Sequence, residues 1–543
     1  MNIVKDKVIY SPLPPRPSPP YQPYIERLLA EVSQEIEETG DRDWIVDTET
    51  GQSHTISKIE PVSRRVAGAL HNLGFGPGDV LQTGYSSCLD FYWPAFGAWL
   101  CGGAVSLADP NLSSTAIKQQ IKDTKAKIIV CSKQYLDKYC AIKQELREED
   151  VHFNLSVLDE EDGNLPADVK SFQSFLNFDG DISHNEKLEY IPDSVTMVLW
   201  SSGSTGNPKG ILHSHRTLQT ISLAKPSSPK SILVSAIMFH IGGFTLNLSI
   251  ALFGGTTSYF IKEKCFSGEN WFKIAEKFQP EHVYIGVSQF IQVSKAKNVD
   301  RNLSGVKMIT PLGGAVSPEC CEKVLSMVGD QAKIIEMYGS TEIVFLAFKL
   351  NKHPKFGFLG TLGSGAEMYI QDIKTGEKLG PRKEGKMMVR TRSMMMNYLN
   401  REEENREFFN SDGFGYVGDV GYYDEEGNIF FCYRMREVLK VDNYWFGPEE
   451  IENLMEALDD INEACVWGEY DMNTGNDQVS LGIVLQANKE EWTETRINEY
   501  ITSNLPITRR ITGKIYLLDR IPHNPQGKKL RREMKNYVQK IEN

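Results

Sequence analysis

The stretch SSGSTGNPKG at residues 201–210 decides how this chain of 543 residues is interpreted. It follows the apolar run Val195–Trp200, which predicts a buried strand, and leads into a second extended run, Gly210–His213. Glycines let backbone N–H groups turn toward a ligand, hydroxyl groups donate to phosphate oxygens, and a lysine supplies positive charge. We therefore expect a loop that joins two strands and binds a triphosphate. Its candidate binding residues are Ser201, Ser202, Gly203, Ser204, Thr205, Gly206 and Lys209.

Two other interpretations of this loop are weaker. A Walker A loop would end in Gly-Lys followed by Ser or Thr and would open a helix, whereas this loop ends in Pro-Lys-Gly and continues as an extended run. A solvated turn rich in serine and glycine would not require the Pro-Lys-Gly ending. The nucleotide-binding interpretation is therefore preferred.

Composition and charge narrow the class of protein. A net charge of −13 argues against nucleic acid or an anionic membrane as the main partner. Nine scattered cysteines without a CxxC pair favour reduced thiols and predict no metal cluster. His213 and His215 share one strand face without cysteine or carboxylate neighbours, so a structural role is expected for them. The sequence shows no signal peptide, no membrane-spanning run and no C-terminal Ser-Lys-Leu, so we expect a cytoplasmic protein.

A strand–helix–Gly-Gly–strand pattern occurs twice in the first half of the chain. The first copy has a strand at 79–83, an apolar helix at 89–101, Gly102-Gly103 and a strand at 104–107. The second copy has the same elements at 231–236, 241–253, 254–255 and 256–260. Two such units predict two similar α/β lobes with a ligand between them.

The last quarter of the chain has shorter and more charged units. Strands are expected at 437–441, 464–467, 478–486 and 514–518, and helices at 448–458, 490–503 and 530–540. These units predict a large domain at 1–433 and a small α+β domain at 434–543. Ten lysines and arginines lie between Arg509 and Lys540 against only Asp519 and Glu533. This run is either a solvated face or a surface that meets a polyanionic substrate.

Further short motifs follow the loop in a fixed order. They are Met238-Phe239-His240, Gly313-Gly314-Ala315, Tyr338-Gly339-Ser340-Thr341-Glu342, Gly418-Asp419, Arg434 and Gly527-Lys528. Small residues allow a ligand to approach the backbone, and an aromatic ring, a hydroxyl and a carboxylate suit adenine, phosphate and a hard cation. In isolation each motif also fits a tight turn, a hairpin position or an exposed lysine.

Together and in this order, the motifs resemble those of the adenylate-forming superfamily. This group contains acyl-CoA and aryl-CoA synthetases, peptide-synthetase adenylation domains and beetle-type luciferases. The resemblance covers about residues 40–540 and looks most like an insect luciferase-like acyl-CoA ligase branch. It implies an α/β fold with a large N-terminal domain of two similar lobes plus a β subdomain, and a small mobile α+β C-terminal domain.

The resemblance also implies the role of each motif. In the large domain, Tyr338, Gly339 and Ser340 would lie beside adenine, Thr341 on phosphate and Glu342 on Mg²⁺. Gly313, Gly314 and Ala315 would flank adenine and the acyl pocket, whose mouth would hold His240. Asp419 would accept the ribose hydroxyls and Arg434 would bind ribose and phosphate. In the small domain, Lys528 would act in adenylation, and Lys440 would reach the adenylate after the domain rotates about Arg436.

The activity implied is a reaction in two steps. A medium-chain or long-chain fatty acid or an aryl acid would be activated by ATP and Mg²⁺ to an acyl-adenylate and then transferred to CoA. The alternative is a luciferase that oxidises a luciferyl-adenylate with O₂. A peptide-synthetase adenylation domain is disfavoured because no carrier domain follows, and an inactive binding protein because both lysines are present. The expected partner is a small carboxylic acid, and a monomer is expected.

Three positions depart from the pattern of the superfamily. Asn443 stands where CoA ligases usually have glycine beside the pantetheine, Asn524 replaces a threonine, and Met238 replaces a proline. Asparagine adopts left-handed backbone conformations more readily than most residues. The backbone path at residue 443 is therefore expected to persist, with less clearance for CoA.

Overall fold

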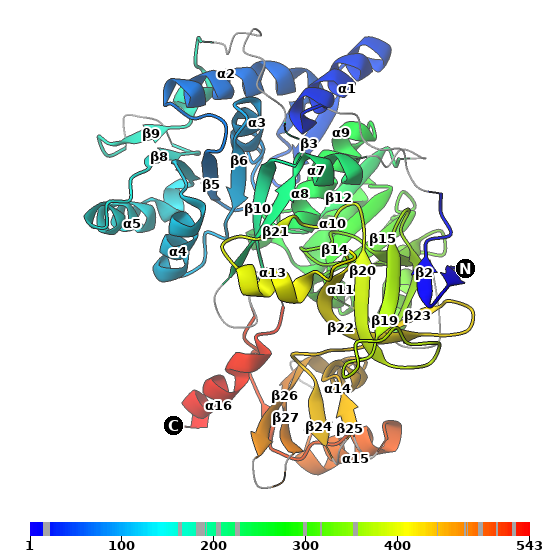
Figure 1. The fold of residues 1–543 in the computed structure, drawn as a ribbon. Helices are drawn as coiled ribbons and strands as arrows, with labels where there is room; N and C mark the ends of the chain where they lie inside the picture. Colours follow the sequence, from blue (N-terminus) through cyan, green and yellow to red (C-terminus); the bar gives the residue numbers. More distant parts are fainter. Residues whose placement is uncertain are drawn as a thin grey trace.

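The computed structural model describes residues 1–14, 22–160, 165–180, 191, 193–201, 208–222, 228–296, 301–314, 316, 318–350, 357–441, 444–471, 474, 476–486, 492–506, 509–523 and 528–542, with the side chains of 350, 444 and 445 excepted. A large body spans most of the chain, and a smaller C-terminal part lies at one end of it (Figure 1). None of the helices in the described residues combines the length and apolar composition needed to cross a membrane.

The first lobe contains an eight-stranded sheet. Its strands are β5 (Val80–Gly84), β6 (Ala104–Leu107), β7 (Ile128–Cys131), β8 (Asn154–Val157), β9 (Val169–Ser171), β10 (Val195–Ser201), β11 (Lys209–Ser214) and β21 (Asn397–Tyr398). They lie in the order β21-β11-β10-β6-β5-β7-β8-β9, and the run from β10 to β9 is parallel. On β7, Ile128 and Val130 join one core, whereas Ile129 and Cys131 join another. Burial on both faces explains why these strands are continuous apolar runs.

Helices cover both faces of this sheet (Figure 1). They are α2 (Ile59–Asn72), α3 (Trp93–Leu100), α4 (Ser114–Thr124), α5 (Leu136–Glu148), α6 (Gln173–Leu176) and α7 (His215–Ile221). The core that contains Ile129 is completed by apolar residues of α4 and α5, and the core that contains Ile128 by residues of α2 and α3.

The second lobe and the β subdomain share one fifteen-stranded sheet. Its strands are β1 (Ile3–Lys5), β2 (Val8–Tyr10), β3 (Asp43–Asp47), β4 (Ser53–Thr55), β12 (Ser231–Val234), β13 (Thr257–Phe260), β14 (His282–Gly286), β15 (Met308–Leu312), β16 (Lys333–Tyr338), β17 (Ala347–Leu350), β18 (Phe358–Leu362), β19 (Glu367–Gln371), β20 (Gly385–Arg390), β22 (Gly415–Tyr423) and β23 (Ile429–Arg434). The order is β1-β2-β19-β20-β22-β23-β18-β17-β16-β15-β14-β12-β13-β3-β4. The run from β16 to β3 is parallel, and the pairs on either side of it are antiparallel.

The helices that accompany this sheet include two that matter for the site. The full set is α1 (Tyr24–Thr39), α8 (Ile241–Thr245), α9 (Ala251–Phe253), α10 (Gly268–Phe278), α11 (Val287–Ser294), α12 (Pro318–Val328) and α13 (Glu402–Phe408). Helix α8 runs into a π-helical turn at Leu246–Ile250 and then into α9. Helix α11 packs beside α10 and α12 through buried Phe290 and Val293.

The two predicted strand–helix–strand units are confirmed, one in each lobe. Strands β5 and β6 are parallel neighbours, and so are β12 and β13. Gly102 and Gly255 follow the two helices with φ of 74° and 66°, a conformation that favours glycine. The first helix begins at Trp93 instead of residue 89, and the second is interrupted by the π-helical turn.

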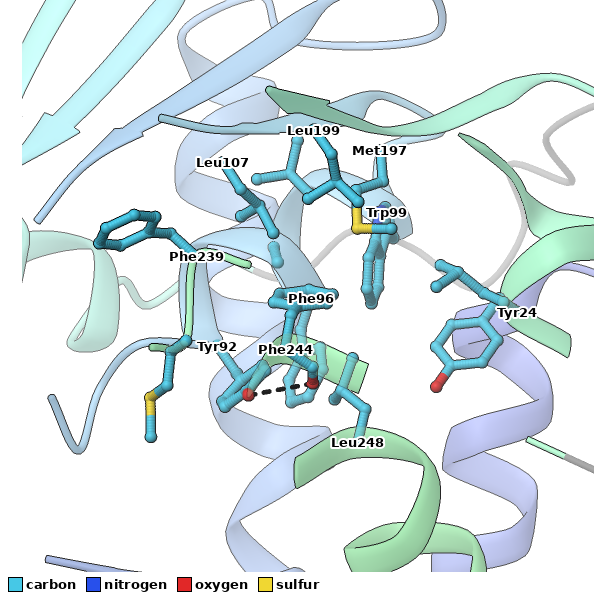
Figure 2. Packing of buried hydrophobic residues seen from close by; sticks show 14 of the residues in the cluster. Tyr24, Tyr92, Phe96, Trp99, Leu107, Met197, Leu199, Phe239, Phe244 and Leu248 are labelled. Atoms are coloured by element: carbon cyan, nitrogen blue, oxygen red, sulfur yellow. Dashed lines mark hydrogen bonds between the residues drawn. The ribbon is translucent and has the colours of Figure 1, made fainter. Parts of the chain in front are cut away.

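The helices of the two units pack against each other in the main core (Figure 2). The Tyr92 hydroxyl donates to the Phe244 carbonyl at 3.1 Å, and the two rings lie 5.2 Å apart. Trp99 contacts Phe244 at a ring distance of 6.0 Å and Tyr24 of α1 at 5.4 Å. Buried aromatic rings contribute large apolar areas, so this contact fixes the two lobes relative to each other.

The small C-terminal part is an α+β unit, as predicted. It contains β24 (Leu439–Val441), β25 (Tyr444–Phe446), β26 (Ile461–Asp471), β27 (Asn476–Leu485) and β28 (Ile515–Leu517), with α14 (Glu449–Glu456), α15 (Glu494–Asn504) and α16 (Met534–Glu542). Strand β26 pairs antiparallel with β27, which pairs parallel with β28. The boundary between residues 433 and 434 stays a prediction.

Part of the basic run at the C-terminus is largely withdrawn from solvent in ion pairs. Lys529 lies 2.7 Å from Glu456, and Arg531 lies 2.9 Å from Glu452 and also pairs with Glu437. Buried charges persist where opposite charges compensate for lost solvation. The run is therefore not only the solvated or substrate-facing surface that the sequence predicted.

Candidate active site

A cavity of about 1780 Å³ opens between the two lobes and the small domain. Five of the described residues that line it carry a buried polar atom without a hydrogen-bond partner among the described residues: Ser235 Oγ, His240 Nε2, Ser340 Oγ, the Tyr416 hydroxyl and Trp467 Nε1. Buried polar groups in folded proteins are nearly always hydrogen-bonded. Five such atoms in residues that line one cavity therefore indicate a place where a polar ligand binds.

The predicted phosphate loop joins two antiparallel strands at this cavity. Ser201 ends β10 and is paired in register with Lys209 at the start of β11, and both residues line the cavity. The Lys209 ammonium lies 3.4 Å from Glu404 and 5.3 Å above the Tyr398 ring. Ser202, Gly203, Ser204, Thr205 and Gly206 lie outside the described residues, so their binding role stays a prediction.

The Tyr338–Glu342 motif begins at the end of β16 and lines the same cavity. Tyr338 is the last residue of β16, and its hydroxyl donates to Asp419 Oδ2. A Cβ atom at Gly339 would lie 2.2 Å from the Val344 carbonyl oxygen, so only glycine fits there. Ser340, Thr341 and Glu342 line the cavity after this tight passage.

Asp419 and Arg434 form an ion pair between neighbouring strands. Asp419 on β22 is 1% exposed and accepts from Arg434 Nε on β23 at 2.8 Å. This carboxylate raises the pKa of Arg434 above its ordinary value, so the guanidinium stays charged. Burial, together with the charge of Asp419, raises the pKa of Tyr338 well above its ordinary value. Tyr338, Asp419 and Arg434 are therefore one hydrogen-bonded unit.

The glycine motif and His240 lie near the acid-binding end that the resemblance implies. Gly313 follows β15 with φ of 94° and lines the cavity. A Cβ atom at Gly314 would lie 3.7 Å from the Val287 side chain, which is an ordinary contact. Ala315 lies outside the described residues. His240 precedes α8, and burial lowers its pKa to about 4, so its ring is neutral at pH 7. A neutral imidazole with a free nitrogen on the wall can donate to or accept from a ligand.

Lys528 of the small domain lines the same cavity as the motifs of the large domain. It lies 3.1 Å from Glu437, which follows the predicted hinge residue Arg436. Burial opposes ionisation of Glu437, but the charges of Arg531, Lys528 and Arg434 outweigh it and lower its pKa to about 2. Lys440 is on β24 and is not among the residues that line the cavity; its backbone N–H donates to Asp477 at 2.7 Å. The structure thus brings Lys528, and not Lys440, to the site.

A magnesium site would rest on one protein carboxylate. The Tyr398 hydroxyl donates to Glu342 Oε1 at 3.0 Å, which orients that carboxylate on the cavity wall. The described residues contain no group of three or more His, Cys, Asp or Glu side chains placed to hold a metal. One carboxylate fits Mg²⁺, which in nucleotide sites is commonly bound by one or two carboxylates and by substrate phosphates.

Two residues beside the motifs were not predicted to take part in the site. His213 on β11 is fully buried, and its Nε2 lies 2.9 Å from the Thr341 carbonyl, which holds the motif in place. The sequence indicated a structural role for His213 but not its partner. Tyr398 orients Glu342 and lies under Lys209. It belongs to β21, a strand of two residues that no sequence pattern indicated.

Models of two protein families match this chain. The model of the AMP-binding enzyme covers residues 32–399, and that of the AMP-binding enzyme C-terminal domain covers residues 450–528. The chain belongs to the AMP-binding enzyme family. The predicted adenylate-forming superfamily and its division into a large α/β part and a smaller C-terminal domain are therefore confirmed.

Known relatives of this AMP-binding enzyme extend along nearly its whole length. 4-Coumarate–CoA ligase 3 of Oryza sativa subsp. japonica is 27% identical over 522 residues, which are 92% of this chain and 90% of the relative. Among solved structures, the anthranilate CoA ligase AuaEII in complex with anthranoyl-AMP has a TM-score of 0.83 at 17% identity, covering 96% of this chain and 98% of that one. The luciferase-like enzyme from the nonluminescent Zophobas morio mealworm has a TM-score of 0.69 at 23% identity, covering 78% and 98%. These neighbours share the fold, and they do not single out the insect luciferase-like branch.

Proposed function

We propose that this AMP-binding enzyme is an acid–CoA ligase that acts on aromatic carboxylic acids. The observation that supports it best is the shared cavity, which brings Tyr338, Thr341 and Glu342 of the large domain together with Lys528 of the small domain. The relatives named above include ligases of 4-coumarate and anthranilate. In the first step an acid carboxylate attacks the α-phosphate of ATP and releases pyrophosphate; in the second, the CoA thiol displaces AMP.

In the first step the protein contributes binding and charge. Lys209 and the loop before it hold the triphosphate, and the Asp419–Arg434 pair binds the ribose beside the Tyr338 ring. Glu342, oriented by Tyr398, would hold Mg²⁺, and the ion when bound would neutralise phosphate charge. Lys528 leaves Glu437 and stabilises the charge that develops between carboxylate and α-phosphate. None of these residues acts as a base, because a carboxylic acid is already ionised at pH 7.

In the second step the small domain has to present a different face. Lys440 lies away from the cavity wall in this structure, so its proposed role in thioester formation requires rotation of the small domain. The hinge is assigned to Arg436, between β23 and β24. Asn443 lies outside the described residues, and its effect on CoA access stays a prediction.

The acid arm of the cavity supports an aromatic substrate with a polar substituent. Its wall is formed by apolar residues such as Ile241, Leu246 and Leu312, which suit a ring. Among them lies Ser235 Oγ, buried and without a partner in the described part of the chain. A hydroxyl or amine on the ring would satisfy this atom, whereas the alkyl chain of a fatty acid would not.

The test is ATP–pyrophosphate exchange with a panel of acids that differ in one feature at a time. Cinnamate and 4-coumarate differ by one hydroxyl, benzoate and anthranilate by one amine, and octanoate and palmitate are the fatty controls. We expect exchange with the aromatic acids. Within each pair, the acid that carries the hydroxyl or amine should be preferred about tenfold, and this preference should decrease in Ser235→Ala. Exchange with the fatty acids alone would contradict the aromatic assignment.

The second half of the test separates a ligase from a luciferase. The purified adenylate is supplied either with CoA or with O₂ alone, and thioester and photons are measured in parallel. We expect thioester with CoA. Photons from a luciferyl-adenylate, with no thioester from any acid of the panel, would replace the ligase by a luciferase.

A further inference from the structure

We propose that Lys295 is a positioning residue for adenylation: it holds the small domain in the orientation that places Lys528 at the cavity. The inference rests on the proposed function for its activity assays, but the contact itself is a feature of the structure. Lys295 immediately follows α11 of the large domain, and its side chain reaches the small domain.

The contact consists of two hydrogen bonds across the domain boundary. Lys295 Nζ donates to the carbonyl oxygens of Ile461 at 2.7 Å and Asn462 at 2.5 Å. These two residues begin β26, the long strand of the small domain. Close by, Lys323 of α12 pairs with Asp459 of the same segment. Two lysines of the large domain therefore hold residues 459–462 of the small domain.

The two lysines do not contribute equally. The Lys323–Asp459 pair is exposed, with 37% and 77% of the side chains accessible, and exposed ion pairs contribute little. Lys295 is largely buried, and burial lowers its pKa while the charge of Glu456 opposes that effect. A charged donor that binds two carbonyls from a partly buried position contributes more than a neutral hydrogen bond. We therefore assign the docking to Lys295.

The contact of Lys295 with the carbonyls of Ile461 and Asn462 is called the dock below. Helix α11 connects this dock to the acid arm of the cavity. Ser288, Gln289 and Gln292 of α11 line the cavity, and Lys295 directly follows the last residue of this helix. Phe290 and Val293 on the same helix are fully buried in the second core. A short helix held in this way moves as one body, so occupation of the acid arm is transmitted to the dock.

The carbonyls of Ile461 and Asn462 belong to the part that rotates. Rotation about Arg436 toward the orientation that presents Lys440 carries these carbonyls away from α11, so Lys295 stabilises only the first orientation. Loss of Lys295 should therefore affect the two half-reactions differently. A residue that only maintained folding would affect both alike.

The experiment compares Lys295→Met with two matched variants. Methionine keeps the apolar stem and removes the donors, Lys295→Arg restores charge and donors, and Lys273→Met changes an exposed lysine of α10 that lies outside the cavity wall and the dock. We expect Lys295→Met to lower acid-dependent ATP–pyrophosphate exchange on the order of tenfold, with thioester formation from supplied adenylate unchanged or faster. Lys295→Arg should recover most of the exchange, and Lys273→Met should match the wild type.

A second measurement does not depend on catalysis. Trypsin cleavage after Arg434 and Arg436 reports how firmly the small domain is docked, because an undocked domain exposes the hinge. We expect faster cleavage there in Lys295→Met than in Lys273→Met, with equal thermal midpoints. If the wild type exchanges with no acid, the proposed function fails while the cleavage assay still tests the dock.

Either of two results would overturn the proposal. One is an equal loss in both half-reactions, or no loss in either. The other is hinge cleavage in Lys295→Met at the rate of the wild type. If Lys295→Met does not fold, Lys295→Gln, which removes the charge and shortens the side chain, is used for both measurements with the same expectations.

Discussion

Lys528 and Glu437 are 3.1 Å apart at the point where the small domain meets the cavity. Replacement of Lys528 by alanine removes one charge-stabilising contact from the transition state of adenylation. We expect Lys528→Ala to lower ATP–pyrophosphate exchange by about 10² to 10³. ATP binding, measured by calorimetry, should be nearly retained because the phosphate loop lies in the large domain. Lys540→Ala on α16 is the control, and unchanged exchange in Lys528→Ala would remove the proposed role.

Val344 adopts a backbone conformation that β-branched residues rarely adopt. Its φ is 60°, and its carbonyl oxygen lies against Gly339 of the cavity motif. A left-handed conformation costs an L-residue about 1–2 kcal/mol, and glycine avoids this cost. The strain is therefore held immediately after the motif, where the chain turns from β16 toward β17.

Relief of this strain should compensate for the loss of the Val344 side chain. We expect the free energy of unfolding of Val344→Gly to remain within about 1 kcal/mol of the wild type. Val389→Gly on β20, where the side chain is fully buried, should lose at least about 2 kcal/mol. Urea denaturation of both variants measures the difference. A loss at Val344 as large as that at Val389 would show that the strain is not significant.

Among the elements, the segment between β23 and β24 is the predicted hinge. The Glu437 N–H donates to the Arg434 carbonyl at 2.9 Å, so a tight turn surrounds Arg436. Proline fixes φ, so Arg436→Pro should slow thioester formation from supplied adenylate more than it slows pyrophosphate exchange. Arg436→Ala separates the loss of the side chain from the loss of backbone freedom. If both half-reactions fell equally in Arg436→Pro, rotation at this residue would be contradicted.

Elements with a strong local pattern were predictable from the sequence. The apolar runs predicted at 195–200 and 231–236 formed the strands β10 and β12, because apolar composition and burial agree locally. The π-helical turn at Leu246–Ile250 was not predictable, since its composition is that of any apolar helix. Leu246, Ser249 and Ile250 of this turn line the acid arm of the cavity. Single π-helical turns often occur at functional sites.

Site residues that belong to a sequence motif were predictable, whereas residues that join the site through tertiary packing were not. The order of the motifs indicated Thr341, Glu342 and Lys528, and the cavity joins all three. Tyr398 and Lys295 act through contacts that are distant in sequence, with Glu342 and with Ile461. Such contacts depend on tertiary structure, which a single sequence does not reveal.

At the scale of the whole molecule, buried histidines make stability depend on pH. Burial lowers the pKa values of His213, His215, His240 and His282 to about 4. Between about pH 6.5 and pH 4 the unfolded chain therefore binds more protons than the folded one, and the free energy of unfolding falls as pH falls. At pH 5, His213 alone accounts for about 2 kcal/mol.

Urea denaturation at pH 7 and at pH 5 measures this dependence. We expect a clear loss of stability in the wild type and a smaller loss in His213→Gln, whose amide can still donate to the Thr341 carbonyl. Glu437, with a pKa of about 2, adds its own loss only below about pH 4.5. Stability that is constant from pH 7 to pH 5 would show that these imidazoles titrate normally.

The hairpin of β1 and β2 forms one edge of the fifteen-stranded sheet through the pairing of β2 with β19, and Asn2 fastens this edge. Its side-chain amide donates to the carbonyls of Gly360 at 3.1 Å and Gly427 at 2.9 Å. On a ribosome that adds about 5–20 residues per second, 425 residues of synthesis separate Asn2 from Gly427, which takes tens of seconds. During that interval the nascent chain carries a strand pair with no neighbour, and an unpaired strand edge favours aggregation. The hairpin is thus made well before β19 and Gly427, with which it pairs in the folded chain, and shielding of its edge during that interval would limit aggregation.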